Sequence, residues 1–451
     1  MVFLWRYRMK LHKISVTKLF GVFDHQINLN NERGITIVIG ENGLGKTVIL
    51  EMIESFFKRD FYRLKNIDFQ ELMFEFEDGI IWNIRKKQSV NKDIYLEINQ
   101  NNLDEIFKLE IYDSSPEKFR REAIQIARMV NSLRRVHPEK WENKYNGEIY
   151  NAIEVVEKFG SDYSSYIGYE FSTKDLETPD WFINRFEYTN VSLIETQRVY
   201  DFDFPDRAPI ETVKKYSKEL TDLIKQKLTE STELSSKLDR TYPNRLIEEL
   251  KSRKKQISED DLNNKLTELE DKRNLLDKVG LVETEKDSHL STIDNPEEVV
   301  KDVLMLHVKD SFEKLSIFDE IAEKIKLLLK IINERFKHKR LFVNKDDGFL
   351  FKSTVIKDEK NIYKKIPIEQ LSSGEKNELI LFYKLIFKSL PNSLILIDEP
   401  EISLHISWQN KFISDLNEIH KLNKLNILIA THSPDIISNN WDLRVELKGV
   451  E

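Results

Sequence analysis

The stretch of sequence that decides the fold is Gly40-Glu-Asn-Gly-Leu-Gly-Lys-Thr47, which matches the pattern GxxxxGKT in full. The β-branched run Ile35–Ile39 precedes it, and apolar residues at helical spacing follow it. A glycine-rich loop between a buried strand and a helix turns backbone N–H groups inward around a phosphate, which also meets the positive end of the helix dipole. We therefore predict a loop that binds the phosphates of a nucleotide, with Mg²⁺ held by the final hydroxyl. The expected binding residues are Gly40, Asn42, Gly43, Gly45, Lys46 and Thr47.

A second chemical signal is Ser393-Leu-Ile-Leu-Ile-Asp-Glu399, an apolar run that ends in two carboxylates. Two adjacent acids could simply end a strand, but the phosphate-binding loop in the same chain favours a catalytic role. At the carboxyl end of a buried strand, Asp398 can hold Mg²⁺ and its waters, and Glu399 can polarise the water that attacks the γ-phosphate. We predict Asp398 as a metal ligand and Glu399 as the general base.

Composition limits the class of protein. Of 451 residues, 40% are apolar, which is enough for a sizeable core, and no run approaches the about 18 apolar residues of a membrane span. The absence of cysteine excludes disulfides and thiolate metal sites, and it is typical of a cytoplasmic protein. The net charge of −8 does not indicate DNA binding, although a local basic patch would still attract DNA. Residues 1–8 lack a signal-peptide cleavage site, and we interpret them as an extension before a natural start at Met9, with Met1 as the alternative.

The N-terminal part of the chain predicts strands over residues 10–20 and 25–29, before the phosphate-binding loop. Residues 70–112 alternate between apolar and polar side chains, and Asp78-Gly79 has the composition of a two-residue hairpin turn. We predict an antiparallel sheet inserted after the first helix. Residues 113–190 have a mixed pattern and are predicted to be mostly helical.

The middle of the chain predicts long helices. Between residues 211 and 280, leucines fall on helical stripes, and Tyr242-Pro243-Asn244 is a natural reversal. We predict two antiparallel helices of about 30 residues each that protrude as a coiled-coil hairpin. Ordinary amphipathic helices packed on the body are the alternative. A long helix is expected from Asn295-Pro296 to about Phe336, followed by a β-hairpin around Asp347-Gly348.

Further along, Leu371-Ser-Ser-Gly-Glu-Lys376 precedes a predicted helix. A serine and a glycine at a helix start form an anion site, which one chain does not need for a single nucleotide. Taken alone this segment is a helix cap, but the phosphate-binding loop and the acid pair favour a functional role. A strand over residues 427–430 then leads to Thr431-His432-Ser433-Pro434, and we expect this strand to be the last in the chain.

Together these motifs resemble those of ATP-binding cassette (ABC) ATPases, including the SMC-like ones. The segment from Leu371 to Lys376 is similar to their LSGGQ signature, with Ser373 in place of the first glycine. The resemblance implies that the signature of one subunit covers the γ-phosphate held by another. The implied roles are phosphate binding for Ser372, Gly374 and Glu375, a link between Mg²⁺ and the attacking water for Gln197, γ-phosphate sensing for His432, and a D-loop at residues 403–405.

The resemblance also implies an architecture. The expected fold is an α/β ABC-type P-loop ATPase head, with a mixed sheet, flanking helices, an antiparallel β-subdomain and an inserted helical coiled-coil hairpin. Two chains are expected to form a head-to-tail homodimer with ATP and Mg²⁺ at the interface, where Lys46, Gln197, Glu399 and His432 act in catalysis. For Phe20 and Phe23, which lie where an adenine-stacking residue could be, we expect core packing. The predicted domains are 1–200 (N-terminal half of the head), 201–338 (helical insertion) and 339–451 (C-terminal half of the head).

Four classes of ATPase compete for this sequence. A transporter subunit is normally shorter and lacks a long central insertion, and a P-loop kinase lacks the signature and the His432 motif. An ATPase of chromosome maintenance or double-strand-break repair has far longer coiled coils. A RecF-like repair ATPase that binds DNA is closer in size and stays the alternative.

The acid-pair, switch-histidine and glutamine motifs, with a short helical hairpin, are most similar to bacterial anti-phage ATPases of the overcoming-lysogenization-defect type and their PARIS and Septu relatives. This resemblance implies a sensor or scaffold in defence, which hydrolyses ATP slowly and controls a separate effector. Too few residues follow His432 for a nuclease domain. The effector is therefore expected to be a separate Toprim or HNH nuclease, with a phage protein as the trigger.

Overall fold

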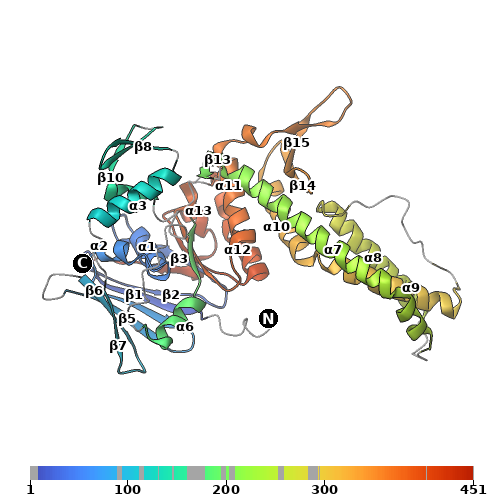
Figure 1. Ribbon diagram of the computed structural model, residues 1–451, viewed down its shortest axis with the longest axis horizontal. Helices are drawn as coiled ribbons and strands as arrows, with labels where there is room; N and C mark the ends of the chain where they lie inside the picture. The colour runs from blue at the N-terminus through green and yellow to red at the C-terminus, as the bar shows by residue number, and fades with distance from the viewer. Residues whose placement is uncertain are drawn as a thin grey trace. The chain divides into compact units, whose positions relative to one another are not determined.

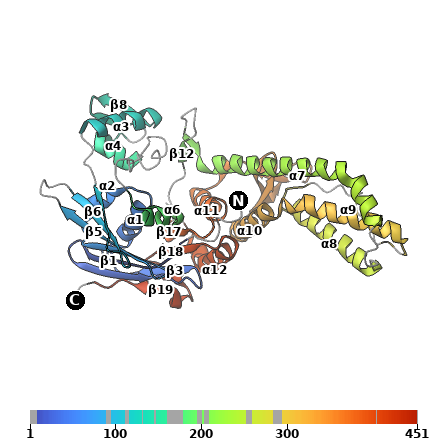
Figure 2. The same cartoon turned by 60° about the horizontal axis from the view of Figure 1, so that its bottom comes forward.

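The structure is a computed structural model that describes residues 9–449 apart from 89–93, 111–115, 131, 145–146, 160–177, 195–199, 203–208, 252–257, 283–292, 294 and 403. The chain divides into two compact units, which Figures 1 and 2 show in two views. The first unit contains Met1–Glu211 and Lys384–Glu451, and the second contains Thr212–Tyr383. The domain boundaries given above stay a prediction. No helix in the described part is both long and apolar enough to cross a lipid bilayer.

A five-stranded parallel sheet forms the centre of the first unit. Three of its strands are short runs of Ile, Leu and Val that are buried on both faces, as expected of a parallel sheet covered by helices. The strand before the P-loop, β3, lies between two strands from much later in the sequence. The order is β11 (Val191–Ile194), β17 (Leu394–Asp398), β18 (Asn426–Ala430), β3 (Ile35–Ile39) and β19 (Arg444–Glu446).

The sequence predicts β18 as the last strand, and this is wrong. After β18 come the short helix α13 (Pro434–Ile437), the 3-10 turn η7 (Trp441–Leu443) and β19. β19 pairs in parallel with β3, and just beyond it the N–H of Leu447 donates to the carbonyl of Ile39 at 2.9 Å. β19 has three residues, of which two are charged, so its pattern is too short to predict a strand.

The predicted antiparallel sheet is confirmed. Asp78-Gly79 reverses the chain between β4 and β5, with Gly79 at a φ of 81°. One face of the sheet packs on α1 (Lys46–Phe57), where the Phe56 ring lies 5.1 Å from that of Phe74. The helix that follows the P-loop therefore shares one hydrophobic core with both sheets. The strand order is β2 (Phe23–Asn28), β1 (Leu11–Leu19), β4 (Glu71–Phe76), β5 (Ile81–Gln88), β6 (Ile94–Gln100) and β7 (Ile106–Glu110).

Residues 113–190, predicted to be mostly helical, also contain a three-stranded sheet. Its strands are mostly polar and lack the alternation that identifies a strand, since only one residue of each is buried. Trp141, 1% exposed, is the largest side chain in the small core that this sheet shares with two helices. The elements are α3 (Pro116–Met129), β8 (Leu133–His137), β9 (Lys140–Asn143), β10 (Ile149–Asn151) and α4 (Ala152–Phe159), followed by α6 (Asp180–Tyr188). Elsewhere in the first unit lie α2 (Phe61–Asn66), α12 (Ile406–Asn423) and the two-stranded β12 (Tyr200–Phe202) and β13 (Pro209–Glu211).

The second unit begins with the long helix α7 (Thr212–Lys251), which runs through Pro243. The predicted reversal at this proline is therefore wrong. Next to it, the Arg245 guanidinium donates to the carbonyl of Leu238 and to both carboxylate oxygens of Asp310 on α9 (Glu298–Ser316). α9 packs against both α7 and α8 (Glu259–Lys278), so three helices lie side by side (Figure 2). Contacts with α9 thus support the continuous helix, which local sequence cannot reveal.

The single long helix predicted to end near Phe336 is two helices. α9 ends at Ser316, and α10 (Asp319–Arg335) begins after Ile317-Phe318, where the Phe318 ring is buried. α9 starts after Glu297 rather than at Asn295-Pro296. An apolar residue is compatible both with a continuous helix and with a break. The hydrophobic pattern therefore does not predict where α9 ends.

A three-stranded antiparallel sheet follows α10. The predicted hairpin is confirmed as β14 (Lys339–Asn344) and β15 (Gly348–Lys357), and β16 (Tyr363–Ile366) extends it. Ser217 of α7 stabilises the turn between β14 and β15. Its hydroxyl donates to the carbonyl of Asp347 and accepts from the N–H of Phe349. The turn η4 (Ile368–Gln370) then leads to α11 (Ser373–Tyr383). The α/β P-loop fold class is confirmed, with parallel and antiparallel strands in separate sheets and a long inserted helix.

Candidate nucleotide-binding site

The P-loop lies between β3 and α1, as the sequence predicts. Gly43 and Gly45 both have a φ of 86°, in the left-handed region that favours glycine. A Cβ on Gly45 would lie 2.6 Å from a methyl carbon of Leu19, so that side chain would have to shift, and the φ of 86° would strain any other residue at this position. The loop therefore turns tightly into the first N–H groups of α1, the geometry that binds a phosphate.

Lys46 is folded back over this loop. Its ammonium donates to the carbonyls of Gly40 at 2.8 Å and Glu41 at 3.0 Å, and the residue is 6% exposed. Burial lowers the pKa of Lys46, and the nearby carboxylates of Glu399, Asp398 and Glu401 oppose that shift. The ammonium of Lys46 therefore lies between the loop and the acids. When a nucleotide binds, its phosphate oxygens would replace the loop carbonyls as acceptors of the hydrogen bonds from Lys46.

Asp398, at the end of β17, meets the P-loop through a hydrogen bond from the hydroxyl of Thr47. Its Oδ1 atom is buried and has no hydrogen-bond partner within the described residues. Burial raises the pKa of Asp398, and the neighbouring carboxylates Glu399, Glu51 and Glu401 raise it further. A hydroxyl beside an unpaired buried carboxylate oxygen is a donor set that fits Mg²⁺, because the cation would compensate the crowded negative charge.

Glu399 and His432 lie next to each other across the ends of β17 and β18. The His432 Nε2 atom is 3.8 Å from Glu399 Oε1, and both side chains are about one-third exposed. Glu399 has a φ of 41°, a strained conformation for glutamate that its N–H stabilises by donating to the carbonyl of Ala430 at 2.9 Å. The predicted base and the predicted sensor are therefore brought together, and their side chains remain accessible.

Sequence reasoning missed Glu401, which holds the histidine segment in place. Its Oε2 atom accepts from the hydroxyl of Thr431 at 2.8 Å, and its Oε1 atom accepts from the N–H of His432 at 2.9 Å. Glu401 belongs to the 3-10 turn η6 (Pro400–Ile402), two residues after the base. A third acid so soon after the pair was the signal that could have identified it.

The turn between β1 and β2 borders the P-loop. Phe20, expected in the core, is 43% exposed, and a Cβ on Gly45 would lie 3.3 Å from its ring. Phe23 packs partly against the core, in line with the prediction, and stacks on His25 at 5.7 Å. His25 Nε2 lies 2.8 Å from the carbonyl of Leu44, to which it donates, and burial lowers the pKa of His25. Phe20 thus offers an open aromatic surface beside the site.

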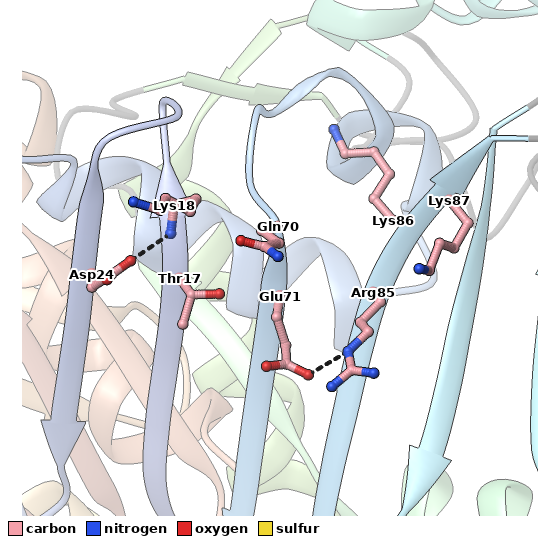
Figure 3. Close-up of a pocket in the computed structure, with 8 residues that line it drawn as sticks. All are labelled: Thr17, Lys18, Asp24, Gln70, Glu71, Arg85, Lys86 and Lys87. Atoms are coloured by element: carbon pink, nitrogen blue, oxygen red, sulfur yellow. Dashed lines mark hydrogen bonds and ion pairs between the residues drawn. The ribbon is translucent and has the colours of Figure 1, made fainter.

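The same turn borders a pocket of about 360 Å³ at one end of the antiparallel sheet (Figure 3). Its charged groups are largely paired, since Arg85 binds Glu71 at 2.7 Å and Asp24 accepts from the N–H of Lys18 at 2.7 Å. The ammonium of Lys86 lies over Phe69 and donates to the carbonyl of Lys65 at 2.9 Å. These contacts stabilise the sheet end and α2, and none involves the P-loop.

The predicted signature lies in the second unit, at the start of α11. Ser372 and Glu375 form a capping box, in which the serine hydroxyl and N–H donate to Glu375 Oε2 at 3.0 and 2.8 Å. Lys339 of β14 donates to the same oxygen at 2.7 Å. Space around Gly374 is open. The serine therefore presents an exposed helix start, and Glu375 is engaged in holding it rather than free to bind a ligand.

A buried ion pair anchors α11. Arg335, at the end of α10, donates to Glu378 at 2.6 Å, and their side chains are 2% and 0% exposed. The guanidinium also lies 4.8 Å from the centre of the Phe382 ring. Burial raises the pKa of Glu378 to about 7, although Arg335 opposes the shift. The helix that carries the signature is thus tied to the end of the helical insertion.

Two predicted positions cannot be placed. Gln197, the proposed link to Mg²⁺ and the attacking water, lies outside the described residues, and so does Ser403 of the predicted D-loop. His405, at the other end of the predicted D-loop, caps the start of α12, because its Nδ1 atom accepts from the N–H of Ser407 at 3.3 Å.

Comparison with known proteins identifies a family. The model of the family AAA_15, described as an AAA ATPase domain, matches residues 9–437. No protein of curated function matches the chain. Among solved structures, the Smc head domain with an extended coiled coil bound to the C-terminal domain of ScpA, derived from Pyrococcus furiosus, is 14% identical, covers 95% of this chain and 91% of that chain, and has a TM-score of 0.31. The SMC head domain from Thermotoga maritima is 9% identical, with coverages of 98% and 100% and a TM-score of 0.31.

Proposed function

The chain belongs to the AAA_15 family of AAA ATPase domains, and from this premise we propose that ATP controls its conformational state in a bacterial anti-phage defence system. As an ATPase it converts ATP and water to ADP and phosphate. In the proposed function it is a cytoplasmic sensor or scaffold, and slow hydrolysis resets it. The observation that supports a nucleotide switch is the convergence of Lys46, Thr47, Asp398, Glu399 and His432 in one unit.

Each side chain has a role that its position supports. Lys46 binds the β- and γ-phosphates, and Glu399 accepts the proton of the water whose oxygen attacks the γ-phosphorus while the bond to the bridging oxygen breaks. Mg²⁺, held by Thr47 and Asp398, would offset negative charge on the phosphates. His432, beside the base, contacts the γ-phosphate, and Glu401 fixes its backbone. Gln197 is proposed as a further contact to Mg²⁺ and the water.

We further propose that the active form is a head-to-tail homodimer. Ser372 and Gly374 at the exposed start of α11 are suited to bind the γ-phosphate held by a second copy, because a helix start attracts anions. ATP then joins two chains, and hydrolysis releases them.

Glu399→Gln tests this mechanism. The substitution keeps the shape of the side chain but removes the base, so turnover should fall by at least about 100-fold, while ATP binding persists and the dimer accumulates. Single-turnover hydrolysis and light scattering with ATP measure both effects. A variant that binds ATP but stays monomeric would exclude the shared site. Lys46→Ala is the companion variant, and unchanged ATP affinity would exclude the role assigned to the P-loop.

The defence role rests on the motif resemblance and predicts a partner. A Toprim or HNH nuclease should co-purify with the chain, and Lys46→Ala should remove phage protection in cells. Co-purification with the full chain and plaque counts measure these outcomes. If neither a nuclease nor protection is found, and the purified chain binds duplex DNA tightly only with ATP, the RecF-like repair alternative replaces the proposal.

A further inference from the structure

The three-stranded sheet β14–β15–β16 has two unlike faces. One face is buried against α10 and α7 and carries apolar side chains. The opposite face carries basic side chains and an exposed aromatic ring. Its members, which we call the cationic face, are Arg340, Phe342, Lys352 and Lys365.

The cations of this face stand directly opposite one another. Arg340 is the register partner of Lys352 on β15, and Lys352 is in turn the partner of Lys365 on β16. Like charges at such positions repel and destabilise a sheet. In the part of the chain that the structure describes, Arg340 and Lys352 have no carboxylate partner, and Lys365 lies 3.7 Å from the exposed Asp347, a contact of little energy. Carboxylates of the described chain therefore do little to neutralise this row of cations, and a bound anion would relieve the repulsion among them.

An aromatic ring lies beside the row. Phe342 is 38% exposed, with the ammonium of Lys352 at 5.2 Å and the guanidinium of Arg340 at 6.0 Å from its ring centre. Further along β15 and β16, Tyr363 is 45% exposed, with the ammonium of Lys357 at 5.0 Å from its ring centre. Exposed rings among cations are the combination that binds unstacked bases and their phosphates.

We propose that the cationic face binds single-stranded nucleic acid. Adjacent strands are about 4.8 Å apart, so the row of three cations spans roughly 10 Å, a length that a few backbone phosphates of one strand can follow. A base stacks on Phe342 beside the row. The bases of a duplex are already stacked and could not stack on the Phe342 ring. An acidic peptide would form ion pairs with the cations but would not stack on the ring. The surface lies within the second unit and requires neither ATP nor an effector, so it goes beyond the proposed function.

The test measures binding of the full chain to a fluorescently labelled single-stranded oligodeoxynucleotide by anisotropy over a range of salt concentrations. Lys352→Ala should weaken binding and reduce the slope of log affinity against log salt by about 0.7, because one phosphate no longer meets a cation. Phe342→Ala should weaken binding at least about fivefold and leave this slope unchanged, because stacking involves no counterion. The matched control is Lys237→Ala, which removes the same charge from an exposed site on α7 and should bind as wild type does.

Other outcomes overturn the inference. Wild-type affinity in both Lys352→Ala and Phe342→Ala would exclude the surface, and equal affinity for a duplex would exclude its preference for single strands. Displacement of the oligonucleotide by polyglutamate at equal charge concentration would indicate an acidic protein partner instead. Lys46→Ala should keep full oligonucleotide binding, which separates this inference from the ATP-dependent function. Thermal unfolding verifies that each variant is folded.

Discussion

At the scale of single residues, the proposed site depends on hydrogen bonds that hold the candidate catalytic groups as well as on those groups themselves. The two carboxylate oxygens of Glu401 accept hydrogen bonds from the Thr431 hydroxyl and the His432 N–H. These contacts fix the backbone that carries the histidine, while Glu399 stays 3.8 Å from the histidine ring. In the proposed mechanism Glu401 is therefore a positioning residue, which acts through His432 and not on the phosphate.

Replacing Glu401 with Gln should lower kcat about 10- to 100-fold with little change in KM, because the histidine segment loses one charge-assisted acceptor. Steady-state ATPase kinetics measure the effect. The control is Asp435→Asn, which also replaces a carboxylate with an amide, in the first turn of α13, and it should leave kcat unaltered. A rise in KM at constant kcat would show that Glu401 acts on substrate binding instead.

The site residues that the sequence predicts are those whose spacing along the chain already implies a chemical role, and these roles stay predictions. Lys46 and Thr47 follow a glycine pattern, and Asp398 and Glu399 end an apolar strand, and the structure places these four residues close together. Glu401 was missed because its role exists only after β17 and β18 pair. Phe20 was expected in the core, but a φ of 55° in the turn leaves its ring exposed.

At the scale of secondary-structure elements, the helical insertion shows where local patterns fail. Pro243 suggests a reversal, but Arg245 holds α7 to α9 through Asp310, and the helix continues to Lys251. The break between α9 and α10 carries no proline or glycine, so no local signal predicts it. The P-loop strand and helix and the antiparallel strands have strong periodic patterns, and they were predicted correctly.

Arg245→Ala should lower the free energy of unfolding by about 3 kcal/mol, because it leaves the Asp310 carboxylate buried without its partner. Chemical denaturation monitored by circular dichroism measures the change. Arg240→Ala removes an exposed arginine from the same helix and should cost far less. The double variant Arg245→Ala with Asp310→Ala should recover part of the loss, and failure to recover would contradict the ion-pair explanation.

At the scale of the whole molecule, stability should depend on pH through Glu378. Its folded pKa of about 7 is above the unfolded value of about 4.3, so the folded state binds the proton more tightly. This contribution to stability is fully present below the unfolded pKa and is lost as the pH rises through about 7. The free energy of unfolding of the wild type, relative to Glu378→Gln, should fall by about 3 kcal/mol between about pH 5 and about pH 8. Parallel pH profiles for the two proteins would contradict this prediction.

The strand order of the parallel sheet has a consequence for biosynthesis. β3, which leads into the P-loop, lies between β18 and β19, and these strands are translated long after it. At the usual rate of synthesis roughly tens of seconds pass before β3 can pair with either neighbour. During this time the nascent chain exposes an unpaired strand of Ile, Thr and Val at its N-terminal end. The nucleotide site therefore cannot assemble before residues 426–446 emerge from the ribosome, and we expect the growing chain to depend on chaperones until then.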